Sequence, residues 1–530
     1  MRKTFTLSML WLHTWAGLVL GWLLFAIWLA GSLCVFWWEI DYWATPERHA
    51  VPVAERSVLI QSAEAYLQRT APGAKRWVIS LPNPDGRDSV LRLSTGSILA
   101  PSAQFLPDNS GRPITTHTMG GRFFVDFHWT LNNSPLGPGA NPIPFFLVGL
   151  AGVAFVWMCI TGVVVHKRIF KDFFTFRPEA GRQRRWLDFH NVFGVLPLPF
   201  HFLIALTGVS FFCFAYLPSA VSTIYKSDSA AFEGQLVSRY KPPAAAAHAG
   251  PGGPAAMYPI MPLVEQAEAQ FGKGLAQTIQ ITNPGRDNAV VEIGRGREGG
   301  INVFNLPGVV SNGVTGQMIR GMEPRSKTLL GWDYFTSLHF AFFGGAFLRW
   351  LYLICGLAGA ATIASGLVMF TIKREQKHGE AGQGSFRWFA DRMNVAAVAG
   401  PMMASIGYMW AIRLLPAAMA HRTDWEVRSF YLVWLFSLVH AFLRKPARAW
   451  TEQLVLAGAL CLGLPVLGFF TPTSSLVFSF THGDVVTASV DLFSAAVGAG
   501  LLVAARYGGR VGARKLRAAL PVGSAAMEAA

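Results

Sequence analysis

The feature that most constrains this chain is a series of long apolar stretches. A membrane-spanning helix needs about 20 predominantly apolar residues, and eight stretches approach or exceed that length. We expect spans at residues 9–38, 143–166, 188–217, 347–372, 392–416, 428–444, 452–471 and 484–505. The sequence therefore predicts a polytopic membrane protein, an all-α bundle of about eight transmembrane helices.

Basic residues indicate the orientation of these spans. The formal net charge is +15, and Lys and Arg gather in the loops 166–185 and 373–392 and in the tail after Arg506. Because cytoplasmic loops are enriched in Lys and Arg, we expect this side to be cytoplasmic, with both termini on it. The same distribution explains the charge without nucleic acid. We expect a multi-pass protein of a bacterial inner membrane, with the segments 39–142 and 218–346 in the periplasm.

These two external segments repeat one another. Each combines a short amphipathic helix, at Val58–Arg69 and at Leu263–Phe271, with apparent strands around a turn. The turns begin at Asn83 (NPDGRDSVLRL) and at Asn283 (NPGRDNAVVEI). Asn, Pro, Asp and Gly between alternating apolar residues are typical of a β-hairpin. We therefore expect two small α+β modules, the second containing a low-complexity linker at 241–254 to which we assign no structure.

The membrane spans repeat as well. Three motif pairs recur in the same order: LHTWAGL at Leu12 with FHNVFGV at Phe189, DFHWTL at Asp126 with SLHFAF at Ser337, and TGVVV at Thr161 with SGLVM at Ser365. The repeated unit is a helix, an external module and a second helix. The last four spans carry no such module, so we expect them to form an appendage.

The predicted organisation follows from these repeats. Its parts are the first span (1–38), the first module (39–142), two spans joined by a basic loop (143–217), the second module (218–346), the fourth span (347–375), the C-terminal four-helix region (392–506) and a basic tail (507–530).

Six histidines lie in or beside the first four spans, and their depth sorts them into two layers. We expect an inner layer of His13, His166 and His190 and an outer layer of His128, His201 and His339. Ionisable side chains inside a membrane mark functional sites, and imidazole is a usual axial ligand of haem iron. These residues are therefore candidate ligands of two b-type haems. Two pairings stay open in each layer: His190 with His13 or His166, and His201 with His128 or His339.

His190 and His201 fall in one predicted span. They are eleven residues apart, which on an ideal helix is about three turns and about 16 Å. A straight helix would therefore place both rings on one face. Pro197 and Pro199 lie between them, and proline kinks a helix, so the shared face depends on that kink.

Other patterns have alternative explanations. The glycines after the histidines and in the TG and SG pairs favour helix packing over contact with a macrocycle. Asp484 and Asp491 share a face of the last span, and Asp491 is a candidate proton or ion site for which the sequence names no partner. None of the five cysteines lies in a CxxC or CxxCH motif, which disfavours disulfides, thiolate zinc sites and c-type haem. Because no nucleotide or flavin motif is present, electrons would come from a separate reductase or a quinol.

Together the motifs resemble the PepSY-associated transmembrane helix family over roughly residues 1–375. The motifs that carry the resemblance are LHTWAGL, AEAYL with its hairpin, DFHWTL, ITGVVVHKR and FHNVFGV. The resemblance implies PepSY-like external modules and haem-ligand roles for His13, His128, His190 and His339. The resemblance extends to members that are inner-membrane ferric-siderophore reductases with b-type haem. The four extra C-terminal spans depart from shorter members and leave the substrate and the electron donor open.

We therefore expect a haem b oxidoreductase that passes electrons across the membrane to a periplasmic ferric chelate such as a ferric siderophore. The main alternative is a non-enzymatic PepSY-type membrane sensor or protease regulator, which would need no haem. A third possibility is a transporter that uses Asp491.

Overall fold

The computed structural model describes residues 2–83, 89–96, 103–133, 141–166, 174–212, 216, 218–226, 252–296, 308–322, 327–341, 343–378 and 385–519. The chain forms two compact units. The helical unit comprises Met1–Pro46, His117–Leu206 and Trp350–Ala530, and the sheet unit comprises Glu47–Thr116 and Thr207–Arg349.

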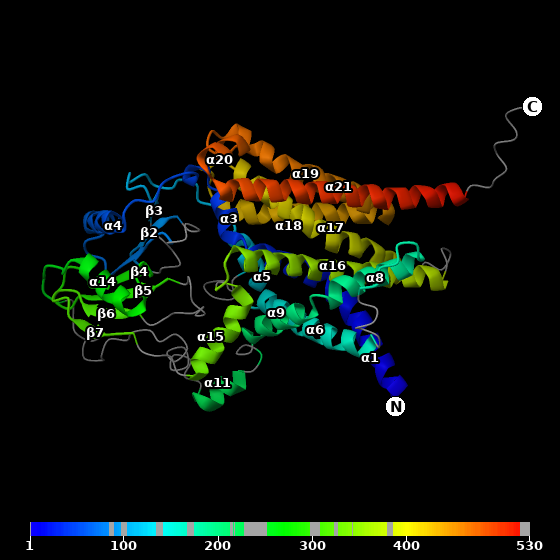
Figure 1. The fold of residues 1–530 in the computed structure, drawn as a ribbon, viewed down its shortest axis with the longest axis horizontal. Coiled ribbons are helices and arrows are strands. Elements are labelled where there is room, and N and C mark those ends of the chain that lie inside the picture. Colours follow the sequence, from blue (N-terminus) through cyan, green and yellow to red (C-terminus); the bar gives the residue numbers. More distant parts are fainter. Residues whose placement is uncertain are drawn as a thin grey trace, which may run out of the picture. The chain divides into compact units, whose positions relative to one another are not determined.

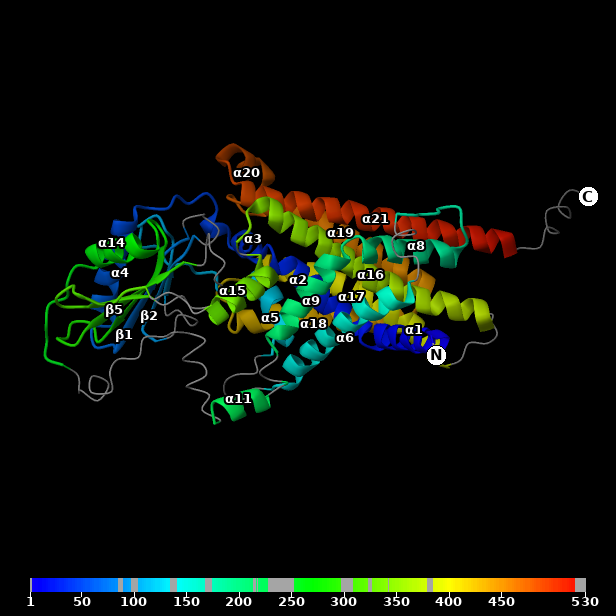
Figure 2. The same cartoon turned by 60° about the horizontal axis from the view of Figure 1, so that its bottom comes forward.

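Helices make up the first unit almost entirely (Figure 1). Those lying wholly or mainly in it are α1 (Arg2–Val19), α2 (Gly21–Cys34), α3 (Trp37–Trp43), α5 (Arg122–Thr130), α6 (Ile143–Val165), α8 (Arg182–Val195), α9 (Leu198–Ser210), α16 (Ala346–His378), α17 (Ser385–Leu414), α18 (Arg422–Leu443), α19 (Pro446–Leu467), α20 (Leu476–His482) and α21 (Val485–Ala519). Both views show α21 running beside α19 (Figures 1 and 2).

Six helices are long and apolar enough to cross a membrane: α6, α16, α17, α18, α19 and α21. Two further pairs pass the same test together but are bent, α1 with α2 by 67° and α8 with α9 by 62°. The described residues therefore hold six candidate spans, or eight if each bent pair is one span. This confirms a mostly helical, multi-pass membrane protein.

The bend between α8 and α9 is the kink that Pro197 and Pro199 were expected to allow, so His190 and His201 do not lie on one straight helix. α8 ends at Val195 and α9 begins at Leu198. Pro197 lies in the break, where its missing N–H group removes a helical hydrogen bond. The two histidines therefore lie on differently directed helices, and the expected separation of about 16 Å along one axis does not apply.

The second unit is built on one antiparallel sheet of seven strands, in the order β3-β2-β1-β4-β5-β6-β7. The strands are β1 (Arg76–Ser80), β2 (Leu91–Ser94), β3 (Ala103–Phe105), β4 (Ala276–Thr282), β5 (Val290–Arg295), β6 (Val309–Asn312) and β7 (Met318–Arg320). The helices of this unit are α4 (Arg56–Thr70), α11 (Pro218–Ile224), α14 (Ile260–Phe271) and α15 (Lys327–Phe340).

The two predicted α+β modules share this sheet instead of standing apart. β1 from the first segment pairs with β4 from the second, with Ile79 opposite Ile279. In separate modules both strands would be exposed edges, and edge strands present unpaired N–H and C=O groups. Pairing them joins the halves through one buried cluster that includes Ile79, Ile279, Leu59 of α4 and Leu263 of α14.

The predicted local elements of the sheet unit are confirmed. α4 and α14 include the expected helices, and β4 and β5 form the second hairpin. Its turn uses positive φ at Asn283 and Gly285, as Asn and Gly allow. In the first hairpin β1 pairs with β2, but residues 84–88 of its turn and most of the linker 241–254 lie outside the described residues.

The C-terminal helices belong to the core of the helical unit and are not an appendage. Phe123 of α5 stacks on Tyr408 of α17, with ring centres 4.0 Å apart, and lies 5.0 Å from Phe430 of α18. These rings share one buried cluster with side chains of α2 and α19. Burial of aromatic surface of this size stabilises a core strongly, so α5 is held by the C-terminal helices.

Candidate functional site

Two of the predicted inner histidines lie next to each other. His13 on α1 and His190 on α8 have ring centres 6.4 Å apart, and their ring planes cross at 87°. Both rings are half-buried. The duplicated sequence motif therefore brings its two histidines together at one place in the bundle.

The hydrogen bonds of these rings fix their tautomers. Nδ1 of His190 lies 2.9 Å from the Thr362 carbonyl oxygen, which can only accept, so Nδ1 carries the proton. Nδ1 of His13 lies 2.9 Å from the Thr161 hydroxyl, which donates its own proton to the Trp157 carbonyl. His13 must therefore also donate from Nδ1. Nε2 is left with its lone pair on both rings.

The residues of the repeated TG and SG pairs contact these two histidine rings. The Ser365 hydroxyl lies 3.0 Å from Nδ1 of His190 and, like Thr161, donates to a carbonyl of its own helix. A Cβ atom added at Gly162 would lie 3.4 Å from Cε1 of His13, and one at Gly366 would lie 3.3 Å from Cε1 of His190. These glycines therefore admit an imidazole ring beside the helix.

His128 of α5 shows the same pattern against α2. Its Nδ1 lies 2.9 Å from the Ile27 carbonyl oxygen, so Nδ1 donates and Nε2 keeps its lone pair. A Cβ atom at Gly31 would lie 2.5 Å from Cε1 of His128, closer than real Cβ contacts come. Only glycine at this position leaves room for the ring.

His339 repeats the arrangement in the sheet unit. Its Nδ1 lies 3.3 Å from the Thr207 hydroxyl, and a Cβ atom at Gly208 would lie 2.7 Å from its Cε1. Gly31 and Gly208 each follow the inner histidine of their own repeat by 18 residues. That spacing is a sequence signal for the pocket of the outer histidine, which inspection of single motifs missed.

His201 is held differently. It is buried, and its Nε2 lies 3.0 Å from the Cys355 carbonyl oxygen, so Nε2 is the donor nitrogen. Its ring lies edge-on to Trp28, 5.5 Å between ring centres, and to Phe155 at 6.2 Å. This hydrogen bond ties α9 to α16.

His166 is the predicted inner residue that the structure does not bring into the pair. It caps the C-terminal end of α6, where its backbone N–H donates to the Gly162 carbonyl. Within the described part of the chain its ring makes no hydrogen bond and no ring contact. The inner pairing that the geometry supports is therefore His190 with His13.

The His13–His190 pair fits the axial ligation of a metal in a planar macrocycle. Ligating histidines usually donate their other ring N–H to a carbonyl or hydroxyl oxygen, as both do here. Metal–nitrogen bonds of about 2 Å would place two ligating rings with their centres about 6 Å apart. Among the described residues no group of three or more His, Cys, Asp or Glu could hold a metal ion, but axial ligation needs only two.

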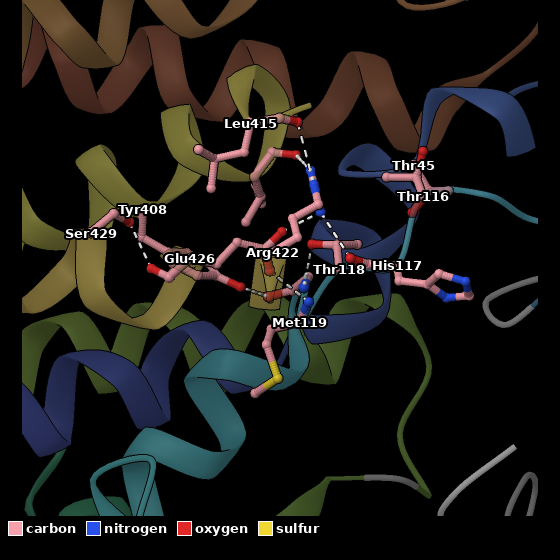
Figure 3. A network of polar contacts seen from close by, with 12 residues as sticks. Thr45, Thr116, His117, Thr118, Met119, Tyr408, Leu415, Arg422, Glu426 and Ser429 are labelled. Atoms are coloured by element: carbon pink, nitrogen blue, oxygen red, sulfur yellow. Dashed lines mark hydrogen bonds and ion pairs between the residues drawn. The ribbon is translucent and has the colours of Figure 1, made fainter. Parts of the chain in front are cut away.

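The helical unit also holds a buried polar network that was not predicted from the sequence. Figure 3 shows Arg422 of α18 donating to the carbonyls of His117 and Leu415 and pairing with Glu426. Glu426 in turn accepts from the backbone N–H of Met119 at 2.7 Å. The network fixes the segment that leads into α5, at Met119, nine residues before His128.

Comparison with known proteins assigns the chain to a family. Residues 10–374 match the PepSY-associated TM region. The chain belongs to this family. The family region contains all six predicted histidines and ends near the C-terminal end of α16, so α17 to α21 lie outside it.

One relative has a similar sequence over most of its own length. It is an uncharacterized protein of Pseudomonas aeruginosa, 25% identical over 332 residues, which cover 60% of this chain and 81% of the relative. This likeness supports the family and adds no activity.

Proposed function

We propose that this member of the PepSY-associated TM family is a haem b-containing membrane oxidoreductase that reduces a ferric chelate, such as a ferric siderophore, in the periplasm. The observation that carries the proposal is the His13–His190 pair, 6.4 Å between ring centres, with both Nδ1 atoms hydrogen-bonded and both Nε2 lone pairs left open. Bis-histidine pairs between facing helices are typical haem sites in helical bundles.

In this proposal His13 and His190 hold the inner haem. Thr161, Thr362 and Ser365 keep both rings in the tautomer that ligates through Nε2. A bound haem supplies one-electron transfer. No side chain needs to act as a general acid or base.

The outer layer supplies the candidates for a second haem. His128 donates from Nδ1 to the Ile27 carbonyl oxygen, and Nδ1 of His339 lies 3.3 Å from the Thr207 hydroxyl. His201 uses Nε2 on the Cys355 carbonyl, which favours a role in fixing α9. The proposal keeps His128 and His339 as candidate outer ligands.

The proposed substrate follows from the chemistry of iron reduction, and the proposed electron donor follows from the motifs that the sequence lacks. Ferrous iron binds hard oxygen chelators less well than ferric iron, so one electron from the donor releases the metal. The sequence contains no nucleotide or flavin motif, so the donor is a quinol or a separate cytoplasmic reductase. The basic loops support a location of the termini in the cytoplasm and of the sheet unit in the periplasm of a bacterial inner membrane.

An optical spectrum of the purified full-length protein tests the proposal. Protein from haem-replete cells should show a Soret band that shifts on reduction with dithionite. His13→Ala and His190→Ala should each lower the haem content, whereas His482→Ala, at an exposed ring of α20, should leave it unchanged. A colourless wild-type protein would overturn the proposal and favour a sensor or regulator without haem.

A further inference from the structure

Three polar side chains form a buried stripe near the start of α21. Asp484, Thr487 and Asp491 are three and four residues apart, a spacing that places them on one helix face. Their exposed fractions are 7%, 0% and 1%. We call these residues the acidic stripe; Asp491 falls within the candidate span Val485–Tyr507.

Neighbouring helices supply two partners to the stripe. The indole N–H of Trp43 on α3 donates to Oδ1 of Asp491 at 2.8 Å. Arg413 of α17 donates to the Trp43 carbonyl at 3.0 Å and lies over the Trp43 ring, 4.8 Å from its centre. Trp43 thus links the carboxylate and the guanidinium.

Within the described residues, several polar atoms of this region are buried without a hydrogen-bond partner. They are Oδ2 of Asp484, Oγ1 of Thr487, Oδ2 of Asp491 and Nη2 of Arg413. An unpaired buried polar group costs about 1–3 kcal/mol. Three unpaired oxygen atoms on one helix face therefore point to something that binds them.

Charged groups act on Asp491 from within the helical unit. Arg413 and Asp484 are the charged groups that act on Asp491. Of the other titratable side chains on α3 and α20, Glu39 is half-buried, Asp41 lies against Gly120, and the exposed His482 ring stacks on Phe478. With Asp484 and Asp491 both ionised, Arg413 offsets at most one of the two negative charges at Asp491, and an uncompensated charge inside a membrane protein is costly.

We propose that the acidic stripe binds one monovalent cation, taken up as a proton by a carboxylate or as Na⁺ by the unpaired oxygen atoms. The uptake of one positive charge cancels the excess negative charge and satisfies oxygen atoms that lack partners. Intramembrane carboxylates are typical of proton and ion sites. This site lies outside the family region and does not depend on haem.

Two measurements on the full-length protein separate the sources. In the proton case, infrared spectra should show the carbonyl stretch of a protonated carboxyl group that titrates with pH in potassium buffer and is missing from Asp491→Asn. In the sodium case, NaCl should raise the thermal unfolding midpoint above that in choline chloride of equal ionic strength, and Asp484→Asn and Asp491→Asn should abolish the rise.

Both variants are designed to fold. The amide oxygen of asparagine can still accept from Trp43 at position 491 and from the Thr487 N–H at position 484. Asp424→Asn, at an exposed carboxylate of α18, is the matched control and should change neither measurement. If wild type and Asp491→Asn have the same carboxyl band and Na⁺ gives no selective stabilisation, the proposal is wrong.

Discussion

The ring centres of His13 and His190 lie 6.4 Å apart, with the two ring planes nearly perpendicular. Each is the first histidine of its repeat, and each donates from Nδ1 to the opposite helix of that repeat. Two copies of one unit thus build a single paired site, as expected when a duplicated helix hairpin packs against its own copy.

The two inner histidines differ in the kind of group that lies nearest to Nδ1, which predicts unequal effects of removing a hydroxyl. The nearest group is the Thr161 hydroxyl for His13, beside the backbone of Met158, and the Thr362 carbonyl for His190, with the Ser365 hydroxyl at 3.0 Å. Losing an outer hydrogen bond of a ligating histidine lowers metal affinity about 10–100-fold. Thr161→Val should therefore weaken haem retention within that range, and Ser365→Ala should have a smaller effect.

Haem retention of detergent-solubilised variants, followed during transfer to an apo-haem acceptor, measures this difference. Ser405→Ala is the control, because the Ser405 hydroxyl donates to a carbonyl of its own helix α17. Equal loss in Thr161→Val and Ser405→Ala would contradict the role assigned to Thr161.

The glycines beside the histidines predict a graded series. A methyl group at Gly31 would meet the His128 ring at 2.5 Å, whereas one at Gly162 would lie 3.4 Å from the His13 ring, an ordinary contact. Overpacking of a filled site costs about 1–3 kcal/mol. Gly31→Ala should therefore lower the unfolding free energy by that amount, and Gly162→Ala should be nearly neutral.

Thermal unfolding in detergent, followed by circular dichroism, ranks the two variants. Gly73→Ala, at a position where an added Cβ atom meets nothing within 4 Å, controls for the effect of alanine itself. A Gly162→Ala protein less stable than Gly31→Ala would reverse the expected order and exclude the packing argument.

The sequence predicted the spans and the local elements because their signals are local. Long apolar stretches marked the candidate spans, and turn residues with alternating apolar residues marked the hairpin at Asn283. Pro197 marked the break between α8 and α9. No proline lies in the first span, so the bend between α1 and α2 could not be predicted from the same signal.

The missed features depend on partners far apart in the chain. Arg422 contacts the His117 carbonyl across 305 residues, and the pairing of β1 with β4 joins two segments that each look complete alone. The two histidine layers were predicted from depth in the membrane alone. Depth gives the position of a residue along the membrane normal but not its position around the helical bundle. That is why His166 and His13 looked equivalent as partners of His190.

The buried ion pair of Arg422 and Glu426 should be essential for stability. Glu426 is fully buried and also accepts from the Met119 N–H at 2.7 Å. Removing one partner of a buried pair leaves an uncompensated charge and costs about 3–5 kcal/mol. Glu426→Ala should lower the unfolding free energy by that amount, as measured by chemical denaturation in mixed micelles.

Asp424→Ala is the matched control for this prediction, because Asp424 is an exposed carboxylate on the same turn of α18. Exposed substitutions usually change stability by less than about 0.5 kcal/mol. Similar losses in Glu426→Ala and Asp424→Ala would show that the network in Figure 3 does not hold the segment before α5.

The sheet unit should lose stability in acid through Glu268 of α14. Burial by itself would raise the pKa of Glu268, but backbone N–H groups, including that of Ala276, and the Arg56 guanidinium bring the pKa below its ordinary value. A carboxyl group with a lowered pKa in the folded state contributes stability that is present above its ordinary pKa and lost as the pH falls through the lowered one. Glu268→Gln should therefore flatten the fall of the unfolding midpoint over that acidic range.

Glu64→Gln supplies a control of opposite sign, since burial raises the pKa of Glu64 on α4 and its ionised form opposes folding. Parallel pH profiles for wild type and Glu268→Gln would show that the contact between α4 and α14 carries no linked proton.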